Sequence, residues 1–213
     1  MPESAPTRLE LPQGRFELHR YPTRKREPLQ AWCGADLLLL EAARPGSTRP
    51  EEILVVNDEH GTLSTVLAPL AMWTDSALSS LALSRNLVRN QRPSVPVAWS
   101  TSPPPTGVRL VLARIPKHLA YFEYQLAVLQ ASLAAGTTLV FAGMDKHLST
   151  HTPELIARYF GAVTRHRGER KARAYSVVRN NDTPHTAPAR PGYHCDALDA
   201  TLVGGSNVFS ASG

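Results

Sequence analysis

Short apolar runs alternate with longer amphipathic segments through most of the chain, and this alternation predicts the fold. Runs with the length of buried strands cover 52–57, 71–74, 95–99, 108–113 and 137–142. Segments in which apolar residues recur at helical spacing cover 29–43, 61–70, 75–91, 117–135 and 152–160. Pro28 is expected to start the first of these helices and Gly136 to cap the end of the fourth. The residues expected to face inward in the third are Leu78, Leu81, Ala82 and Leu87. Strand–helix alternation at this spacing predicts an α/β fold, with a mostly parallel sheet and helices on both faces.

Further strand candidates flank this core. Residues 15–21 alternate polar with apolar side chains, as does a half-buried strand. Two candidates, 162–167 and 171–178, flank Gly168, and 194–203 adds one last strand. Pro96 predicts an edge position for 95–99, because proline cannot donate a hydrogen bond to a neighbouring strand. Five strand–helix units closed by such a pair resemble a class I methyltransferase domain, a seven-stranded Rossmann relative, although other doubly wound folds share this order.

Composition is that of a folded protein with free thiols. The chain has 213 residues, of which 42% are hydrophobic and 19% charged. It is long enough to bury a core without a disulfide or a metal. Neither a membrane span of ~20 apolar residues nor a secretory signal is expected. Cys33 and Cys195 lie far apart without a CxxC motif, which favours a reducing cytoplasm. His147 and His151 are four residues apart, but no Cys or carboxylate joins them, so no metal is expected.

Cofactor positions in a fold of this kind lie at the carboxyl ends of the strands. After the first core strand, Asn57 is followed by a single glycine, Gly61, where a nucleotide-binding loop needs several. The alternative is an ordinary turn with Gly61 at positive φ and Asp58 as a cap. Asp75 stands near the spacing expected for a ribose-binding carboxylate, and its alternative role is to cap the next helix.

The segment after the fourth core strand offers no catalytic residue. Amino-group methyltransferases place an Asn/Asp-Pro-Pro-aromatic motif there, whereas this chain reads Arg-Ile-Pro-Lys. Arg114 and Lys117 carry no side-chain acceptor for an amine, so they either contact phosphate or are solvated. Pro116 is the one matching residue, and we expect it to begin the following helix.

Several segments carry a family resemblance, in order along the chain. They are Pro-Leu-Gln-Ala-Trp at 28–32, Val-Asn-Asp at 56–58, Ile-Pro-Lys at 115–117, Lys-Ala-Arg at 171–173 and Asn-Val-Phe-Ser at 207–210. Together they resemble the N-terminal domain of the bacterial ribosomal RNA large-subunit guanine-N2 methyltransferase G family, within the "methyltransferase small" superfamily. The single glycine and Arg-Ile-Pro-Lys then fit a degenerate cofactor site, in which Asn57, Gly61, Asp75, Arg114 and Pro116 are vestigial.

The resemblance implies two tandem methyltransferase-like domains. The second carries the cofactor loop, and the first supports RNA recognition and its partner's folding. S-adenosylmethionine is then the cofactor of the whole protein, with none expected on this portion. The implied partners are large-subunit ribosomal RNA and the C-terminal catalytic domain, in the cytoplasm. The expected divisions are a disordered 1–14, a methyltransferase-like domain at 15–178, a linker with an extra strand at 179–206, and the start of a catalytic domain at 207–213.

Positive charge concentrates in the segment 165–173. The expected RNA contacts are Arg165, Arg167, Arg170, Lys171 and Arg173, together with Lys117. A second basic group lies at 20–26. The alternative for 165–173 is a solvated edge that protects an exposed strand. The formal net charge of +5 permits a nucleic-acid partner without requiring one.

Three functions remain open. The leading hypothesis is a non-catalytic N-terminal domain of a ribosomal RNA guanine-N2 methyltransferase, which binds RNA and supports the catalytic domain. The first alternative is a complete small S-adenosylmethionine-dependent methyltransferase with a divergent site. The second is a scaffold whose surface only holds a partner domain.

Overall fold

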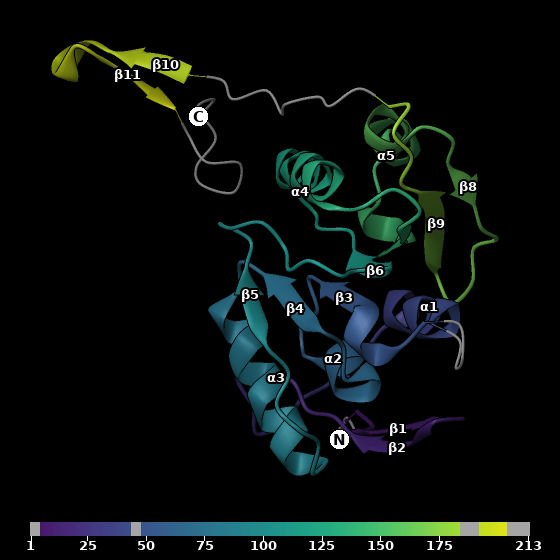
Figure 1. Ribbon diagram of the computed structural model, residues 1–213. Helices are drawn as coiled ribbons and strands as arrows, with labels where there is room; N and C mark the ends of the chain where they lie inside the picture. Colours follow the sequence, from purple (N-terminus) through teal and green to yellow (C-terminus); the bar gives the residue numbers. More distant parts are fainter. Residues whose placement is uncertain (1–4, 44–47, 184–191, 204–213) are drawn as a thin grey trace.

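The computed structural model describes residues 5–43, 48–183 and 192–203, and its central feature is a seven-stranded sheet (Figure 1). In chain order its strands are β3 (Ile53–Val56), β4 (Ala71–Thr74), β5 (Val97–Trp99), β6 (Leu110–Arg114), β7 (Thr138–Met144), β8 (Thr164–Arg165) and β9 (Ala172–Val178). The spatial order is β5-β4-β3-β6-β7-β9-β8. The first five strands are parallel, and β9 runs antiparallel to β7 and β8. The predicted mostly parallel, seven-stranded sheet is confirmed, with β5 at the edge.

Helices cover both faces of this sheet, as predicted. They are α1 (Gly34–Ala42), α2 (Thr62–Leu67), α3 (Ala77–Arg89), α4 (Leu119–Ser132) and α5 (Thr152–Phe160), with short 3-10 turns η1 (Pro50–Glu52), η2 (Asp145–His147) and η3 (Asp196–Leu198). Leu54 and Val56 pack with α4 and α5, whereas Ile53 and Val55 pack with α1 and α2. Successive residues of one strand therefore point to opposite faces, and both faces are buried.

An N-terminal hairpin corrects the expectation that residues 1–14 are disordered. Strands β1 (Arg8–Leu11) and β2 (Gly14–Glu17) pair antiparallel. Leu9 and Phe16 lie opposite each other, and both are buried against the α1 and α2 side of the core. Their pairing stabilises a segment whose Pro, Ser and Glu content favours disorder. Residues 1–4 lie outside the described part of the chain.

Helix boundaries differ from the prediction at several places. The helix predicted at 29–43 begins only at Gly34, so Pro28 does not start it. Gly136 is not the C-cap of α4, because that helix ends at Ser132 and Leu133 is its C-cap. The strand predicted at 194–203 is instead a separate hairpin, β10 (Gly192–Cys195) and β11 (Ala200–Val203), interrupted by η3. The predicted start of a catalytic domain at 207–213 lies outside the described residues.

The start of α3 corrects two further predictions. Ser76, not Asp75, caps this helix, and its Oγ accepts a hydrogen bond from the backbone N of Ser79 at 3.2 Å. Leu78 and Leu81, predicted to face inward, are 55% and 47% exposed. The buried face instead carries Ser79, Ala82, Leu83, Asn86 and Leu87. The buried face of α3 therefore includes Leu83 and Asn86, which were not among the residues predicted to face inward.

Gly61 provides a test of how tightly α2 and α3 pack. Its φ is +73°, and an added Cβ would lie 2.4 Å from Leu83 Cα. Gly61→Ala should therefore lower the free energy of unfolding by about 2–4 kcal/mol, from left-handed backbone strain and overpacking together. Urea denaturation measures this loss.

Gly136→Ala is the matched control, because its φ is +85° and nothing lies within 4 Å of the added Cβ. It should cost only the strain, about 1–2 kcal/mol. Equal losses in the two variants would contradict the close packing of α2 against α3.

Candidate functional site

The carboxyl ends of β3, β4 and β6 meet at one edge of the sheet, and the predicted vestigial residues gather there. Asn57 and Gly61 follow β3, Asp75 follows β4, and Arg114 ends β6. The sheet order thus brings together the positions where a fold of this class holds its cofactor. Their side chains make contacts within the protein, which are described next.

Asn57 links the β3 loop to β6 and α4. Its Nδ2 donates hydrogen bonds to the carbonyl O of Arg114 and to Oε1 of Gln125, both at 2.9 Å. Gln125 Nε2 donates back to Asn57 Oδ1 at 2.9 Å. Gln125 is a buried residue of α4, and this reciprocal amide pair satisfies both side chains internally. The Asn57 side chain therefore serves the packing of α4 over the strand ends.

The loop that follows Asn57 has the geometry of an ordinary turn. Gly61 adopts the left-handed conformation immediately before α2. The buried Asp58 accepts a hydrogen bond from the backbone N of Ser64 through Oδ2 at 2.8 Å. Burial raises the pKa of Asp58 to about 6, although this hydrogen bond acts in the opposite direction. One glycine packed against α3 leaves no glycine-lined approach for a phosphate or a methionine moiety.

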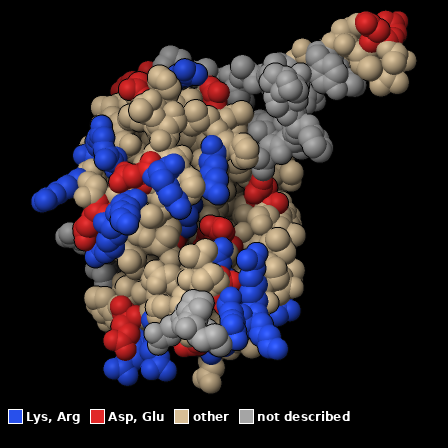
Figure 2. Space-filling view, turned by 180° about the vertical axis from the view of Figure 1, so that it is seen from behind, with Lys and Arg blue, Asp and Glu red and all other residues tan. Residues whose placement is uncertain are grey.

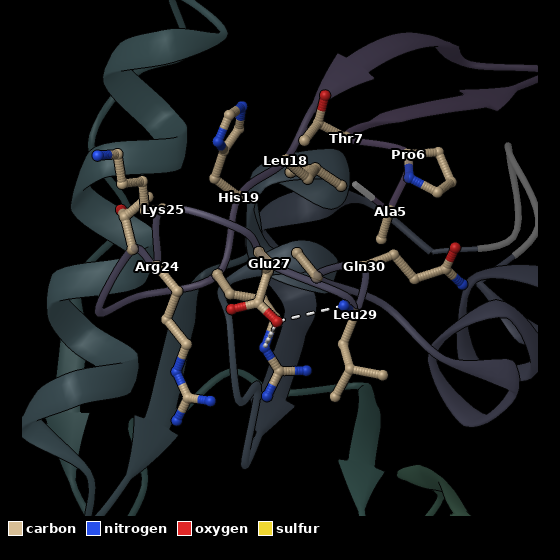
Figure 3. A pocket seen from close by; sticks show the side chains of 13 residues that line it. Ala5, Pro6, Thr7, Leu18, His19, Arg24, Lys25, Glu27, Leu29 and Gln30 are labelled. Atoms are coloured by element: carbon tan, nitrogen blue, oxygen red, sulfur yellow. Dashed lines mark hydrogen bonds and ion pairs between the residues drawn. The ribbon is translucent and has the colours of Figure 1, made fainter. Parts of the chain in front are cut away.

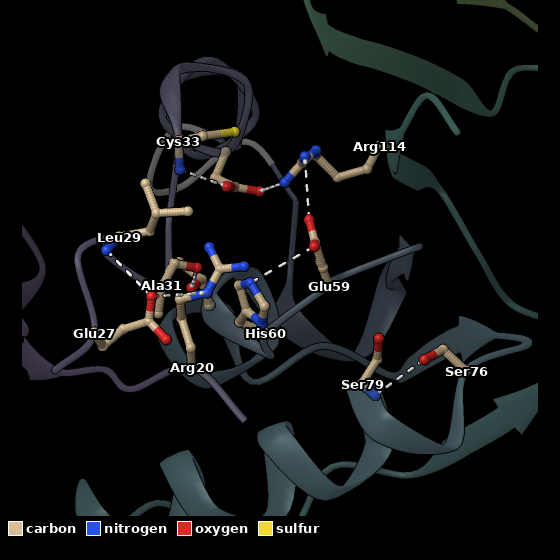
Figure 4. A network of polar contacts seen from close by, with 12 residues as sticks. Arg20, Glu27, Leu29, Ala31, Cys33, Glu59, His60, Ser76, Ser79 and Arg114 are labelled. Atoms are coloured by element: carbon tan, nitrogen blue, oxygen red, sulfur yellow. Dashed lines mark hydrogen bonds and ion pairs between the residues drawn. The ribbon is translucent and has the colours of Figure 1, made fainter. Parts of the chain in front are cut away.

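A network of polar side chains closes the same edge between β6 and α1 (Figure 4). We call it the Arg114 network; its members are Cys33, Asp36, Glu59, His60 and Arg114. Arg114 Nη1 lies 2.7 Å from Asp36 Oδ1, and the two side chains are 17% and 3% exposed. Glu59 Oε2 lies 3.8 Å from Arg114 Nη2, and the backbone N of Cys33 donates to Asp36 Oδ2 at 2.8 Å.

The charges of this network favour internal pairing. Burial alone would lower the pKa of Arg114, but Asp36 and the other neighbouring groups together outweigh it, so the pKa is raised and the ion pair persists. Burial lowers the pKa of His60 and raises that of Cys33. At neutral pH these two groups are uncharged, and the thiol is a poor nucleophile. Arg114 therefore pairs with α1 rather than contacting phosphate.

The other residues predicted at this edge, Asp75, Pro116 and Lys117, are not members of the Arg114 network. Asp75 is exposed after β4, next to Tyr121 of α4, whose pKa is raised by burial and also by Asp75. Pro116 precedes His118, the N-cap of α4, so it does not begin that helix. Lys117 is exposed in the same loop. Asp36 was missed by the sequence analysis, although an acidic residue inside the apolar run 35–40 signals a buried partner.

The basic segment forms the hairpin that joins β8 to β9. Glu169 and Ala172 exchange backbone hydrogen bonds of 2.9 and 2.8 Å across a two-residue turn. The central residues, Arg170 and Lys171, both have positive φ, at 53° and 57°. Tight hairpin turns favour this geometry because it matches the strand twist, and they usually place Asn or Gly there.

Two of the five predicted basic side chains anchor this hairpin. Arg170 Nη1 lies 2.7 Å from Glu41 Oε1 on α1, and Arg173 Nε lies 3.3 Å from Asp145 Oδ1. The tip also rests on Gly34, where an added Cβ would lie 2.4 Å from the carbonyl O of Arg170. The other three are Arg165, Arg167 and Lys171. They are exposed and make no ion pair within the described part of the chain.

Basic and acidic side chains both occur on the surface around this hairpin. Figure 2 shows Lys and Arg side chains at the side of the molecule where β8 and β9 lie in Figure 1, with acidic side chains among them. The hairpin turn follows β8 and precedes Ala172, which pairs with Met144 at the end of β7. The turn therefore lies at the carboxyl edge of the parallel strands, the edge that also holds Lys117.

Neither a metal-ligand group nor a membrane-spanning helix occurs among the described residues. No group of three His, Cys, Asp or Glu among the described residues could hold a metal ion. Within the same residues, no helix combines the length and apolar character needed to cross a bilayer.

Asp58 gives the stability of the chain a predictable pH dependence. Its pKa of about 6 in the folded state exceeds the ordinary 3.8, so between these values the folded chain holds a proton that the unfolded chain has lost. This contribution should fall by about 3 kcal/mol as the pH rises from 4 to 6, and stay level above 6. Asp58→Asn removes it, so urea unfolding of both proteins at several pH values isolates the effect. A difference between them that is independent of pH would refute it.

Solved structures confirm the fold class. The chain matches T. thermophilus 16S rRNA N2 G1207 methyltransferase (RsmC), solved with AdoMet and guanosine, at a TM-score of 0.59 and 17% identity; the match covers 92% of this chain and 51% of that one. It also matches a putative RNA methyltransferase from Pyrococcus horikoshii at a TM-score of 0.52 and 12% identity, covering 79% of this chain and 94% of that one. Both likenesses establish a methyltransferase-type fold.

Curated relatives and a family model agree on the family. Ribosomal RNA large subunit methyltransferase G of Pseudomonas syringae pv. syringae is 35% identical over 95% of this chain and 56% of its own length. The protein of the same name from Shewanella sp. strain MR-4 is 30% identical over 92% and 54%. The chain thus spans about half the length of these relatives. The family model described as RLMG N-terminal domain matches residues 6–181, and the chain belongs to this family.

Proposed function

We propose that the chain is the non-catalytic N-terminal domain, with its core at 15–178, of a large-subunit ribosomal RNA guanine-N2 methyltransferase. In this proposal it binds RNA and supports a catalytic part supplied by the rest of a chain about twice as long. The observation that carries the proposal is the filled carboxyl edge of the sheet. Asn57 pairs with Gln125 there, and Arg114 pairs with Asp36.

The fit of S-adenosylmethionine to this edge supports the same conclusion. A nucleotide cofactor needs a glycine-lined loop and polar groups directed outward. Here one glycine is packed against α3, and the amide, guanidinium and carboxylate groups are engaged with each other. The residues do not fit the cofactor, so we assign it to the remainder of the longer protein. This filling argues against a complete small methyltransferase.

The hairpin supports RNA contact. Its unpaired cations, Arg165, Arg167 and Lys171, share the carboxyl edge with Lys117, so one RNA backbone can meet all four. Arg170 and Arg173 hold the hairpin in place through Glu41 and Asp145. We propose large-subunit ribosomal RNA and the catalytic part as partners, without a metal and in the cytoplasm where that RNA resides. The scaffold alternative predicts that these cations contact no RNA.

The cofactor assignment is tested by calorimetry. Titration of the chain with S-adenosylmethionine should give no binding at concentrations up to the millimolar range, because the strand ends are occupied by side chains. Micromolar affinity would overturn the assignment and favour the complete small methyltransferase.

RNA contact is tested by charge reversal in the hairpin. Arg167→Glu combined with Lys171→Glu should weaken binding of a large-subunit ribosomal RNA fragment at least tenfold in a gel-shift assay. The slope of log affinity against log salt should fall by about 2, one for each lost phosphate contact.

The matched control combines Arg89→Glu with Arg109→Glu. These exposed residues lie at the end of α3 and before β6, at the opposite edge of the sheet, and the change in charge is the same. It should leave the salt slope nearly unchanged. If the hairpin variant binds RNA as well as this control does, the domain acts as a scaffold.

A further inference from the structure

A cavity of about 250 Å³ lies beside the loop that leads from β2 toward α1 (Figure 3). It is formed by two segments, 5–7 and 18–31, and its lining includes no residue of the hairpin or of the Arg114 network. Hydrogen bonds join the segments: the backbone N of Leu18 donates to the carbonyl O of Thr7 at 2.7 Å, and that of Ala5 donates to Glu27 O at 3.0 Å. The walls therefore have a fixed relative position.

Buried side chains hold both ends of the 18–31 loop. Asn86 of α3, fully buried, accepts from the backbone N of His19 at 3.0 Å and donates to its carbonyl O at 2.9 Å. Thr62 at the start of α2 donates to the carbonyl O of Ala31 at 2.9 Å. In addition, the Arg85 guanidinium lies 4.3 Å from the Tyr21 ring. The cavity is thus largely preformed, as small-ligand sites usually are.

The charge around the cavity is uncompensated. Arg20, Arg24 and Lys25 line it together with a single acidic residue, Glu27. Glu27 Oε1 accepts from the backbone N of Leu29 at 3.2 Å and lies 3.8 Å from Arg20 Nε. Arg24 and Lys25 make no ion pair within the described residues, and they extend to opposite sides of the loop in Figure 3. An anion at the cavity would therefore meet one of these cations directly, and the other would lie across the loop from it.

The remaining lining is suited to more than a bare anion. Ala5, Pro6, Leu18 and Ala31 provide apolar wall, and Leu29 adds a side chain that is 57% exposed. Thr23 and Gln30 provide a hydroxyl and an amide, which can bond a sugar or a base edge. The volume lies just below the range of ~300–1,000 Å³ typical of pockets for drug-sized ligands, so it suits one nucleotide and excludes two.

We propose that this cavity binds a single 5′-phosphorylated nucleotide, either free or as one residue of single-stranded RNA. One of Arg24 and Lys25 contacts the phosphate, the other attracts it across the loop, and the apolar wall contacts the nucleoside. Where the nucleotide belongs to RNA, the site rests on the proposed function and adds a second contact away from the hairpin. Binding of a free nucleotide is independent of that function.

The test titrates the chain with uridine 5′-monophosphate, uridine and single-stranded octauridylate, followed by NMR chemical shifts. Uridine 5′-monophosphate should bind saturably with shifts in 18–31, whereas uridine should bind at least tenfold more weakly. Arg24→Gln combined with Lys25→Gln should weaken nucleotide binding at least fivefold. Arg26→Gln is the control, because Arg26 is exposed on the same loop but does not line the cavity. It should change the affinity less than twofold.

These measurements distinguish RNA from a free nucleotide as the ligand, and they test the cavity site separately from the proposed function. Tighter binding of octauridylate, weakened by the Arg24 and Lys25 changes, identifies an RNA residue; equal binding identifies the free nucleotide. The hairpin variant should leave binding of uridine 5′-monophosphate unchanged. Absence of that binding, or equal losses in the Arg26 control, overturns the cavity site even where the hairpin variant still loses RNA. Nucleotide binding with no hairpin effect on RNA would overturn the proposed function alone.

Discussion

The buried ion pair between Arg114 and Asp36 is the interaction on which the rest of the structure depends. It joins the end of β6 to the first turn of α1. Removing one partner would leave a buried charge uncompensated, which typically costs about 3–5 kcal/mol. Through α1 the pair also sets the position of Gly34 and Glu41, which make two of the three contacts that hold the basic hairpin in place. One electrostatic contact thus closes the strand ends and orients the surface proposed to meet RNA.

The same fold can hold a nucleotide or bury the space that would receive one, and the difference lies in a few side chains. Nucleotide sites depend on backbone that a ligand can approach closely, which requires several glycines. Here an amide pair and an ion pair stand at the strand ends, with the two partners of each pair bound to one another. Positive charge that faces solvent lies instead at Lys117, on the hairpin at the same edge, and on the loop around Arg24 and Lys25.

The sheet could be predicted because strands buried on both faces are continuous apolar runs, and Pro96 marks an edge. Features that depend on distant partners could not. Leu9 is ordered by Phe16 and the core beneath it, and the partner of Arg114 is far away in the sequence at Asp36. Local spacing could not tell Ser76 from Asp75 as the cap of α3, since both residue types cap helices well. Nor could it separate Arg170 and Arg173, which anchor the hairpin, from their unpaired neighbours.

The turn at Arg170 and Lys171 has a consequence for how sequence variation is tolerated there. Two side chains at positive φ cost roughly 1–2 kcal/mol each relative to glycine, so this turn is less stable than the same turn with glycine at both positions. Asn-Gly would form the same turn without this cost, but it would remove both positive charges. The turn is therefore strained but carries two positive charges, and the ion pair of Arg170 with Glu41 of α1 offsets part of the lost stability. Substitutions that relax the backbone at this turn would stabilise the domain and at the same time remove two positive charges from its surface.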